Sequence, residues 1–404
     1  MTGPSLAASH EALSPDIPVE EVPAPPVADS RQEVALRRVL HLINGEHYAG
    51  AEKVQDLLGL RLGDCGFSVT FACLKPDQFP VMRQSQDARL VEVPMRSRFD
   101  LRPAFQLARR LRDEGFELIH THTPRAALIG QLAARLAGIP LVHHVHGQTA
   151  VEVGRRGISW LSAQVERRSL RRAKRLIAVS ESSAAYLRQQ GFDPQRIGIV
   201  PNGVPTPVTG RTSTPPVTNW TIGTVALFRP RKGTEVLLEA IASLRGEGLP
   251  VRLRAVGGFE TPEYEQLVRS HAEALGIVEA VDWVGFRQDV SAELAQMDVM
   301  VLPSLLAEGL PMVVIEAMAS GVPVLGSRVP GIVDVIRHDV DGLLAEPNDA
   351  ASLAEQLRRL VRGEADWSAL RQQAQARHAE RYSAESMARG VAQIYRDVLD
   401  ASDE

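Results

Sequence analysis

Two carboxylates, Glu308 and Glu316, flank the start of a predicted helix in the second half of the chain. Residues 303–319 predict the end of a strand, a turn that contains Gly309, and then the helix. Backbone N–H groups at such a helix start attract anions such as phosphates. Glu308 is placed to accept hydrogen bonds from sugar hydroxyls, and Glu316 is within reach of a ribose diol. On spacing alone, an ordinary helix with an acidic first turn explains the pattern as well.

Motifs of three other chemistries are missing from the sequence. No G-x-G-x-x-G follows the first predicted strand, so the sequence gives little support for a dehydrogenase. No G-x-x-x-x-G-K-[ST] occurs, which excludes a P-loop kinase. No G-x-S-x-G occurs, which removes the nucleophile elbow of serine hydrolases.

Composition narrows the class of protein. The chain has 404 residues, 44% of them hydrophobic, and a net charge of -4. This length suggests two domains, and the near-neutral charge argues against a nucleic-acid partner. No apolar run reaches the roughly 18 residues of a membrane span, and the start of the chain does not resemble a secretory signal. Two cysteines, Cys65 and Cys73, fit a reducing cytosol, so we expect a cytoplasmic protein.

Charge and proline are concentrated at the start of the chain. Residues 1–36 hold six acids, one base, six prolines and no Phe, Trp or Tyr. Such a segment cannot bury enough apolar surface to offset its ordering entropy. We predict a disordered tail over 1–36.

From residue 37 onward, apolar runs alternate with amphipathic stretches, which predicts parallel α/β sheets covered on both faces. The first series of predicted strands is 39–43, 68–73, 118–122, 141–146, 176–180 and 197–200, with helices at 51–62, 101–114 and 125–137. The second series is 222–228, 251–256, 281–286, 299–303 and 323–326, with helices at 234–245, 262–275 and 311–320. We predict one domain over 37–205, completed by a C-terminal helix within 380–404, a linker over 206–219, and a second domain over 220–379. A cleft at the carboxyl ends of the two sheets is the expected ligand site.

The segment around Glu308 and Glu316 resembles the E-x7-E signature of family 4 retaining glycosyltransferases, which have the GT-B fold of two Rossmann-like domains facing a cleft. The resemblance runs from about residue 39 to the C-terminus. Further landmarks lie in order at 49–52, 120–122, 146–147, 178–180, 201–204, 222–225, 231–233, 321–324, 330–336 and 341–344. It implies a nucleoside diphosphate sugar as donor substrate, with no cofactor, and a glycan or lipid-linked glycan as acceptor.

The resemblance also implies roles for particular residues. Lys232 and Arg229 would face the donor diphosphate, where fixed cations stabilise a leaving group that gains charge. The family usually has Gly-Arg before this lysine, whereas this chain has Ala226 and Leu227. Arg229 shares a face with Leu227 if the strand continues that far, and is our candidate for the missing arginine.

Other expected donor contacts come from both domains. Gly50 would lie near the donor phosphate and the acceptor, although an ordinary strand–helix turn explains this glycine equally well. Gly309, Leu310 and Pro311 form the turn that leads into the predicted helix. Backbone contacts around Arg287 would select the nucleotide base.

His146 ends a predicted strand, and the resemblance places it near the donor sugar, opposite Glu308. His120 and His122 share a strand face, as do His144 and His146, which makes a metal cluster conceivable. No acidic or cysteine ligand stands at an obvious spacing. We therefore predict no metal site and interpret His120, His143 and His144 as hydrogen-bonded or partly buried strand residues.

Residues 155–175 form a basic stretch with eight Lys or Arg and one acid. Ile158, Leu161 and Val165 recur at helical spacing beside Trp160. A basic amphipathic helix of this kind can contact an anionic membrane peripherally, on its cytoplasmic face. A solvated helix packed on the sheet is the alternative.

The sequence therefore predicts a retaining hexosyltransferase, acting in cell-surface polysaccharide or glycoconjugate synthesis. By resemblance, the leaving phosphate itself takes the proton of the acceptor hydroxyl. Two alternatives stay open: a nucleotide-sugar epimerase of the GT-B fold, and a non-catalytic sugar-nucleotide sensor.

Overall fold

The computed structural model describes residues 36–48, 50–97, 100–146, 170–207, 214–216 and 218–401. The chain divides into two units, Met1–Ala35 and Leu36–Glu404. The predicted tail, apart from Leu36, and half of the predicted linker lie outside the described residues. So do residues 147–169, which hold most of the predicted basic helix.

The first sheet has seven parallel strands in the order β3-β2-β1-β4-β5-β6-β7. Its strands are β1 (Arg37–Ile43), β2 (Phe67–Cys73), β3 (Arg89–Glu92), β4 (Leu118–Thr121), β5 (Leu141–Val145), β6 (Arg175–Ala178) and β7 (Ile197–Ile199). Sequence analysis missed β3, a four-residue edge strand whose ends are exposed. A short strand with one neighbour needs no long apolar run, so its signal is weak.

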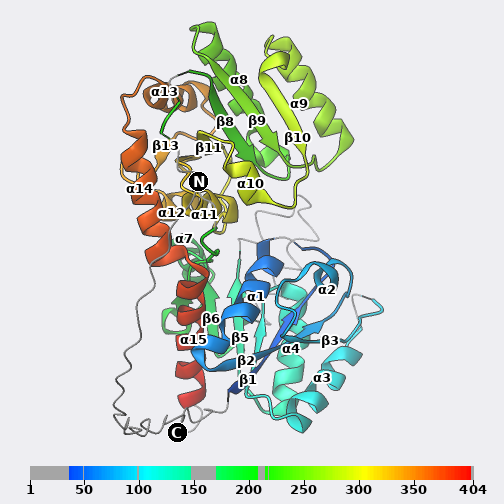
Figure 1. Ribbon diagram of the computed structural model, residues 1–404. Coiled ribbons are helices and arrows are strands. Elements are labelled where there is room, and N and C mark those ends of the chain that lie inside the picture. Colours follow the sequence, from blue (N-terminus) through cyan, green and yellow to red (C-terminus); the bar gives the residue numbers. More distant parts are fainter. Residues whose placement is uncertain are drawn as a thin grey trace, which may run out of the picture. The chain divides into compact units, whose positions relative to one another are not determined.

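Helices cover both faces of the first sheet because side chains alternate along each strand. Val39 and Ile43 of β1 pack with α1 (Gly50–Arg61) and α15 (Ala384–Asp400). Leu40 and Leu42 face the opposite side, which α3 (Arg102–Asp113), α4 (Pro124–Ala137) and α7 (Glu181–Gln189) cover. A short helix, α2 (Gln78–Met82), follows β2. Figure 1 shows α15, the red C-terminal helix, beside α1.

The second sheet has six parallel strands in the order β10-β9-β8-β11-β12-β13. Its strands are β8 (Trp220–Val225), β9 (Val251–Val256), β10 (Val281–Gly285), β11 (Val299–Leu302), β12 (Val324–Ser327) and β13 (Leu343–Ala345). One face packs on α8 (Thr234–Gly246), α9 (Pro262–Ala274) and α13 (Ala350–Val361). The other packs on α10 (Val290–Leu294), α11 (Met312–Ala319) and α12 (Ile332–Val335).

Two features of the second sheet differ from the sequence prediction. The edge strand β13 was missed, as β3 was, because it has three residues. The predicted strand 222–228 ends at Val225, and Pro230–Lys232 form a 3-10 turn. After α13, α14 (Trp367–Arg377) and a π-helical turn at His378–Tyr382 lead into α15.

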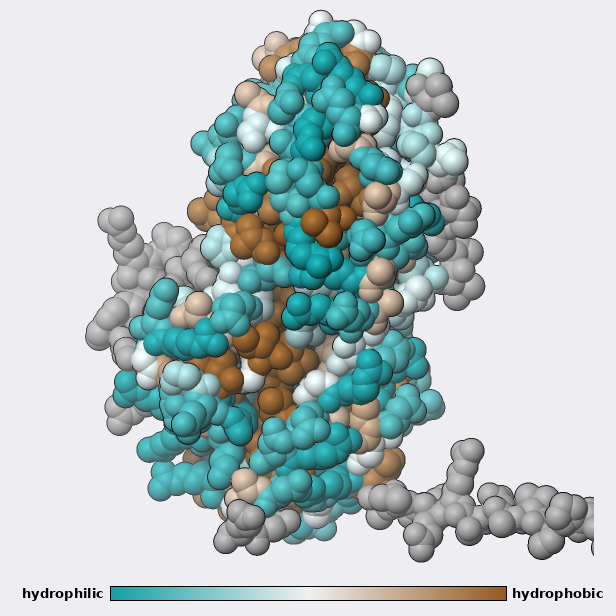
Figure 2. All heavy atoms as spheres, turned by 90° about the vertical axis from the view of Figure 1, so that its left-hand side faces the viewer, coloured by the Kyte–Doolittle hydropathy of each residue, from teal (hydrophilic) through white to brown (hydrophobic). Residues whose placement is uncertain are grey.

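Strand order reverses beside β1 in the first sheet and beside β8 in the second. Ligands of doubly wound folds bind at the carboxyl ends of the strands at such switch points. The surface elsewhere is mixed: on the face drawn in Figure 2, hydrophilic residues cover most of the area and apolar residues form small groups. In the part of the chain that the structure describes, no helix is both long and apolar enough to cross a membrane.

Candidate active site

A cleft of about 960 Å³ lies at the carboxyl ends of both sets of strands. Segments that follow β1, β5, β8, β9, β10 and β11 contribute to its lining. All ten residues singled out from the sequence line it, namely Gly50, His146, Arg229, Lys232, Arg287, Glu308, Gly309, Leu310, Pro311 and Glu316. The structure thus brings the predicted residues together, while their individual roles stay predictions.

Glu308 is the centre of a charged cluster on one side of the cleft. Its Oε1 lies 2.6 Å from Nζ of Lys232 and accepts a hydrogen bond of 2.7 Å from Oγ of Ser304. Its Oε2 lies 3.1 Å from Nη2 of Arg231. The side chains of both bases are about 15% exposed and that of Glu308 is 8% exposed. Two bases against one carboxylate leave a net positive charge at this wall of the cleft.

Burial and charge act together on the ionisation of this cluster. Burial lowers the pKa of Lys232 below its usual value, and the Glu308 carboxylate only partly offsets this. Burial alone would raise the pKa of Glu308, but the Lys232 ammonium, the Ser304 hydroxyl and the Arg231 guanidinium bring it below the usual value. Glu308 is therefore ionised at neutral pH and holds both bases at the cleft.

Two glycines fix the loops that carry this cluster. Gly233 follows Lys232 with a φ of +66°, and a Cβ at this position would overlap the carbonyl oxygen of Pro303. Gly331 has a φ of +88°, and a Cβ there would overlap the carbonyl oxygen of Glu308. Only glycine adopts such conformations at little cost, so both loops can approach the Glu308 turn closely.

Arg229 lines the cleft, but the strand face on which it was expected does not form. Because β8 ends at Val225, the face shared by Leu227 and Arg229 is not part of a strand. The Arg229 side chain is 29% exposed, and its Nη1 lies 3.7 Å from Glu260. Arg231 instead joins Lys232 on Glu308. Arg231 lies in a family landmark and directly precedes Lys232 in the turn, but it was not among the predicted site residues.

Glu316, on α11, is opposite Lys53 of α1. Its Oε1 lies 3.6 Å from Nζ of Lys53, and both residues line the cleft. Sequence analysis missed Lys53, because no motif distinguishes it from other helical lysines. Gly50 also faces α11, since a Cβ on it would lie 3.9 Å from Cγ of Met312. That is an ordinary contact, so the structure does not require glycine at position 50.

The remaining donor-side residues form the floor and one rim of the cleft. The carbonyl of Gly309 accepts a hydrogen bond of 3.0 Å from Oγ of Ser180, which ties this turn to the segment after β6. Leu310 is buried, and Pro311 immediately precedes α11. At the rim, Arg287 is half-exposed and lies 3.5 Å from Glu293, beside the exposed ring of Phe286.

His146 faces the cleft from the end of β5. Its Nε2 lies 2.9 Å from Nδ1 of His122. Burial lowers the pKa of His146 to about 4, so its ring is neutral at pH 7. Because Nε2 is engaged by His122, the Nδ1 atom is the one left without a partner that could contact a sugar hydroxyl. The following residue, Gly147, lies outside the described part.

The wall of the cleft on the side of the first sheet is less charged than the wall around Glu308. Tyr48, Leu57, Met82 and Gln84 line it, and the Tyr48 hydroxyl donates a 2.6 Å hydrogen bond to Asp56. Asp56 also accepts hydrogen bonds from the backbone N–H groups of Gln84 and the next residue. This wall thus combines apolar side chains with a few fixed polar groups.

The parallel sheets, the cleft between their carboxyl ends and its basic wall define a GT-B glycosyltransferase, and comparisons with known proteins agree. The family model "Glycosyltransferase Family 4" matches residues 48–207, and "Glycosyl transferases group 1" matches residues 211–381. The chain belongs to this family of glycosyltransferases, which includes retaining enzymes of the type that the E-x7-E segment predicted.

Relatives and solved structures support the same assignment. A UDP-Gal:alpha-D-GlcNAc-diphosphoundecaprenol alpha-1,3-galactosyltransferase of Escherichia coli is 26% identical over 65% of this chain and 70% of its own length. A D-inositol 3-phosphate glycosyltransferase of Streptomyces scabiei is 30% identical over 69% of this chain and 68% of its own length. The crystal structure of Anabaena HepE in complex with UDP has a TM-score of 0.78 at 20% identity, covering 89% of this chain and 100% of that one. These findings confirm the predicted fold and enzyme class, and they give no support to an epimerase or a sensor.

Proposed function

We propose that this enzyme transfers a hexosyl group, with retention, from a nucleoside diphosphate sugar to a hydroxyl of a lipid-linked or polysaccharide glycan. The observation that carries the proposal is the basic wall of the cleft, where Lys232 and Arg231 converge on Glu308. The similarity to a galactosyltransferase whose name gives a diphosphoundecaprenol-linked sugar as its acceptor supports the lipid-linked acceptor class.

The basic wall matches the charge that develops in such a reaction. As the bond between the anomeric carbon and the phosphate oxygen breaks, the diphosphate gains negative charge. Preorganised cations in a partly buried site stabilise that charge more than solvent would. The acceptor oxygen forms the new bond to the anomeric carbon on the same face, and its proton goes to the departing phosphate oxygen.

The other residues of the cleft would orient the two substrates. Glu316, on α11, would accept hydrogen bonds from the ribose diol, and Lys53 holds this carboxylate at the cleft from the first-sheet side. Neutral His146 would contact hydroxyls of the donor sugar. The wall of Tyr48, Leu57, Met82 and Gln84 would receive the acceptor, because its mixed lining suits a glycan attached to an apolar group.

A thermal-shift panel of nucleoside diphosphates and nucleotide sugars tests the donor class. A bound donor stabilises the folded state by about 2.7 kcal/mol at a hundredfold excess over Kd. We expect a shift with one nucleoside diphosphate, uridine diphosphate being the first to test, and a smaller shift for Lys232→Ala. Product analysis with and without an acceptor then tests transfer, and conversion of the sugar nucleotide without an acceptor would contradict it.

We further propose that the enzyme contacts an anionic membrane surface peripherally, from the cytoplasm. A cavity of about 450 Å³ beside β5 is lined by the exposed bases Arg135, Arg172 and Lys174. No carboxylate lines this cavity among the described residues. Each base near an anionic surface contributes about 1 kcal/mol. Sedimentation with anionic but not neutral vesicles, weakened by salt and by Arg172→Ala with Lys174→Ala, is the expected result; equal sedimentation with both kinds of vesicle would contradict it.

A further inference from the structure

A row of histidines runs across one face of the first sheet. His41 of β1 pairs in register with His120 of β4, which pairs with Val142 of β5. His122, two residues beyond His120, falls on the same face, as do His144 and His146. This face is the one that α1 and α15 cover. Sequence analysis considered the histidines of β4 and β5 but not His41, because only the strand register brings β1 beside them.

These rings hold several polar atoms that the surrounding protein does not satisfy. Within the described ranges, no hydrogen-bond partner is found for His41 Nδ1, His120 Nε2, His122 Nε2, His144 Nδ1, His144 Nε2 and His146 Nδ1. All six atoms are buried. An unsatisfied polar atom in the interior typically costs about 1–3 kcal/mol. Because a neutral imidazole has one lone-pair nitrogen, at most five of these six atoms carry a free lone pair, and their concentration in one place points to a ligand for lone pairs.

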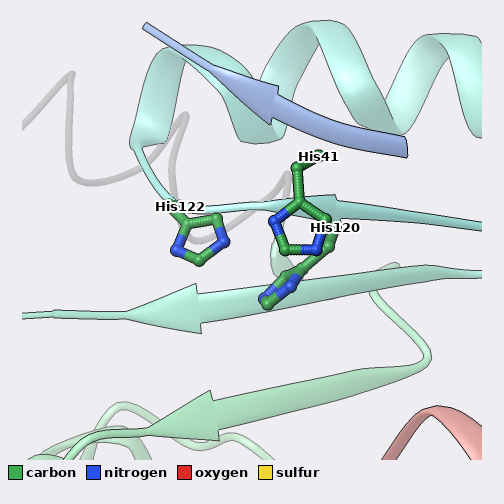
Figure 3. A group of neighbouring side chains, drawn as sticks. All are labelled: His41, His120 and His122. Carbon is green, nitrogen blue, oxygen red and sulfur yellow. The ribbon is translucent and has the colours of Figure 1, made fainter. Parts of the chain in front are cut away.

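Three of the rings, those of His41, His120 and His122, lie close together in this row. Figure 3 shows the side chain of His41 reaching toward His120, with His122 beside them. The ring centroids are 4.8 Å apart for His41 and His120, 4.1 Å for His120 and His122, and 5.6 Å for His41 and His122. One ring nitrogen of each lies within 4.8 Å of one ring nitrogen of the others.

Each of the three rings has one nitrogen within hydrogen-bond distance of a neighbouring side chain. The hydroxyl oxygen of Tyr395, on α15, lies 2.9 Å from His41 Nε2 and 2.6 Å from His120 Nδ1. The phenol oxygen has two lone pairs and can accept an N–H from both rings. His122 Nδ1 is held by His146 at 2.9 Å. Metal-binding histidines characteristically have their second nitrogen fixed in this way, so that the free nitrogen presents its lone pair.

We propose that His41, His120 and His122 bind one first-row transition metal ion, with Zn²⁺ as the best fit. Three imidazoles and no carboxylate suit zinc and its neighbours rather than calcium or magnesium. With metal–nitrogen bonds of about 2.0–2.1 Å, the nitrogens of a tetrahedral site stand roughly 3.3 Å apart. The three nitrogens, which lie within 4.8 Å of one another, would have to move closer together to bind one ion. The ion would join β1, β4 and α15 and, through His122, set the orientation of His146 at the cleft.

Metal binding by the purified full chain tests this proposal without an activity assay. The protein is stripped with a chelator and titrated with Zn²⁺, and bound metal is measured by mass spectrometry. Co²⁺ in place of Zn²⁺ reports the geometry through its visible absorption. We expect about one equivalent of bound metal, an intense tetrahedral cobalt band and a higher melting temperature on loading. Binding well below one equivalent in the wild type would overturn the proposal.

Variants locate the ion. His41→Gln removes a ligand, and we expect it to lose at least tenfold in zinc affinity. His143→Gln is the matched control, since His143 is equally buried on β5 but faces the other way and contacts Thr121 at 2.8 Å. If His41→Gln fails to fold, Tyr395→Phe keeps all three ligands and loosens two of them, with roughly tenfold weaker binding expected.

Two results of the variant series would contradict the assignment. If His41→Gln binds zinc as tightly as the wild type does, the ion is not bound by the group of His41, His120 and His122. The same holds for Tyr395→Phe where that variant replaces His41→Gln. Loss of binding in His144→Gln together with retention in His41→Gln would place the ion on His122, His144 and His146, a second group with nitrogens within 4.8 Å of one another.

Discussion

Replacing Arg231 by alanine should weaken donor binding more than replacing Arg229. Arg231 is the second base on Glu308, at 3.1 Å, and its side chain is 16% exposed. A hydrogen bond from such a charged group to a diphosphate is worth about 1.5–3 kcal/mol. At 1.4 kcal/mol per factor of ten, Arg231→Ala should bind the diphosphate roughly ten- to a hundredfold more weakly.

Arg229 provides the matched comparison two residues away. It lines the same cleft, but its side chain is 29% exposed and its partner Glu260 is half-exposed at 3.7 Å. A partly exposed, loosely paired charge of this kind contributes about 0–1 kcal/mol. Arg229→Ala should therefore reduce affinity by no more than about fivefold.

Calorimetric titration of both variants with the nucleoside diphosphate selected by the thermal-shift panel measures the difference. Glu308 keeps Lys232 and Ser304 as partners in Arg231→Ala, so the melting temperature should change little and a loss of affinity would reflect the site. Arg231→Lys retains the charge without the planar fork and should fall between the wild type and the alanine variant. A larger loss in Arg229→Ala than in Arg231→Ala would refute the reasoning.

Further expectations concern other parts of the cleft and the tail. Glu316→Ala should weaken donor binding about tenfold or more, whereas Lys53→Ala should have a smaller effect. If calorimetry gives Glu316→Ala the donor affinity of the wild type, Glu316 is not part of the site. Gly233→Ala should destabilise the fold by at least about 1–2 kcal/mol, whereas Gly246→Ala, with open space around its Cβ, should be neutral or stabilising by denaturant titration. Initial transfer rates should not depend on added Mn²⁺ or Mg²⁺, because protein cations face the diphosphate; a full requirement for either ion would contradict this. Deleting residues 1–36 should leave the melting temperature and donor turnover nearly unchanged, and a drop of many degrees would show that the tail packs.

The sequence by itself determined the order of the elements and most of the cleft. Alternating apolar runs predict two parallel sheets because a strand buried on both faces must be continuously apolar. Glu308, Glu316 and Lys232 were selected through the resemblance to a family signature, which short segments of adjacent residues carry. The same locality explains the misses at β3 and β13, which are short edge strands with little apolar signal.

Tertiary structure alone decided which of these residues meet. Arg231 rather than Arg229 joins Lys232 because β8 ends at Val225 and a 3-10 turn follows. The secondary-structure propensities of the residues around Val225 do not define this strand end. The pairing of Lys53 with Glu316, and of His41 with His120, joins residues separated by 263 and 79 positions. Such pairings depend on strand register and on helices packed from distant parts of the chain, because burial of the whole core, and not any local pattern, sets them.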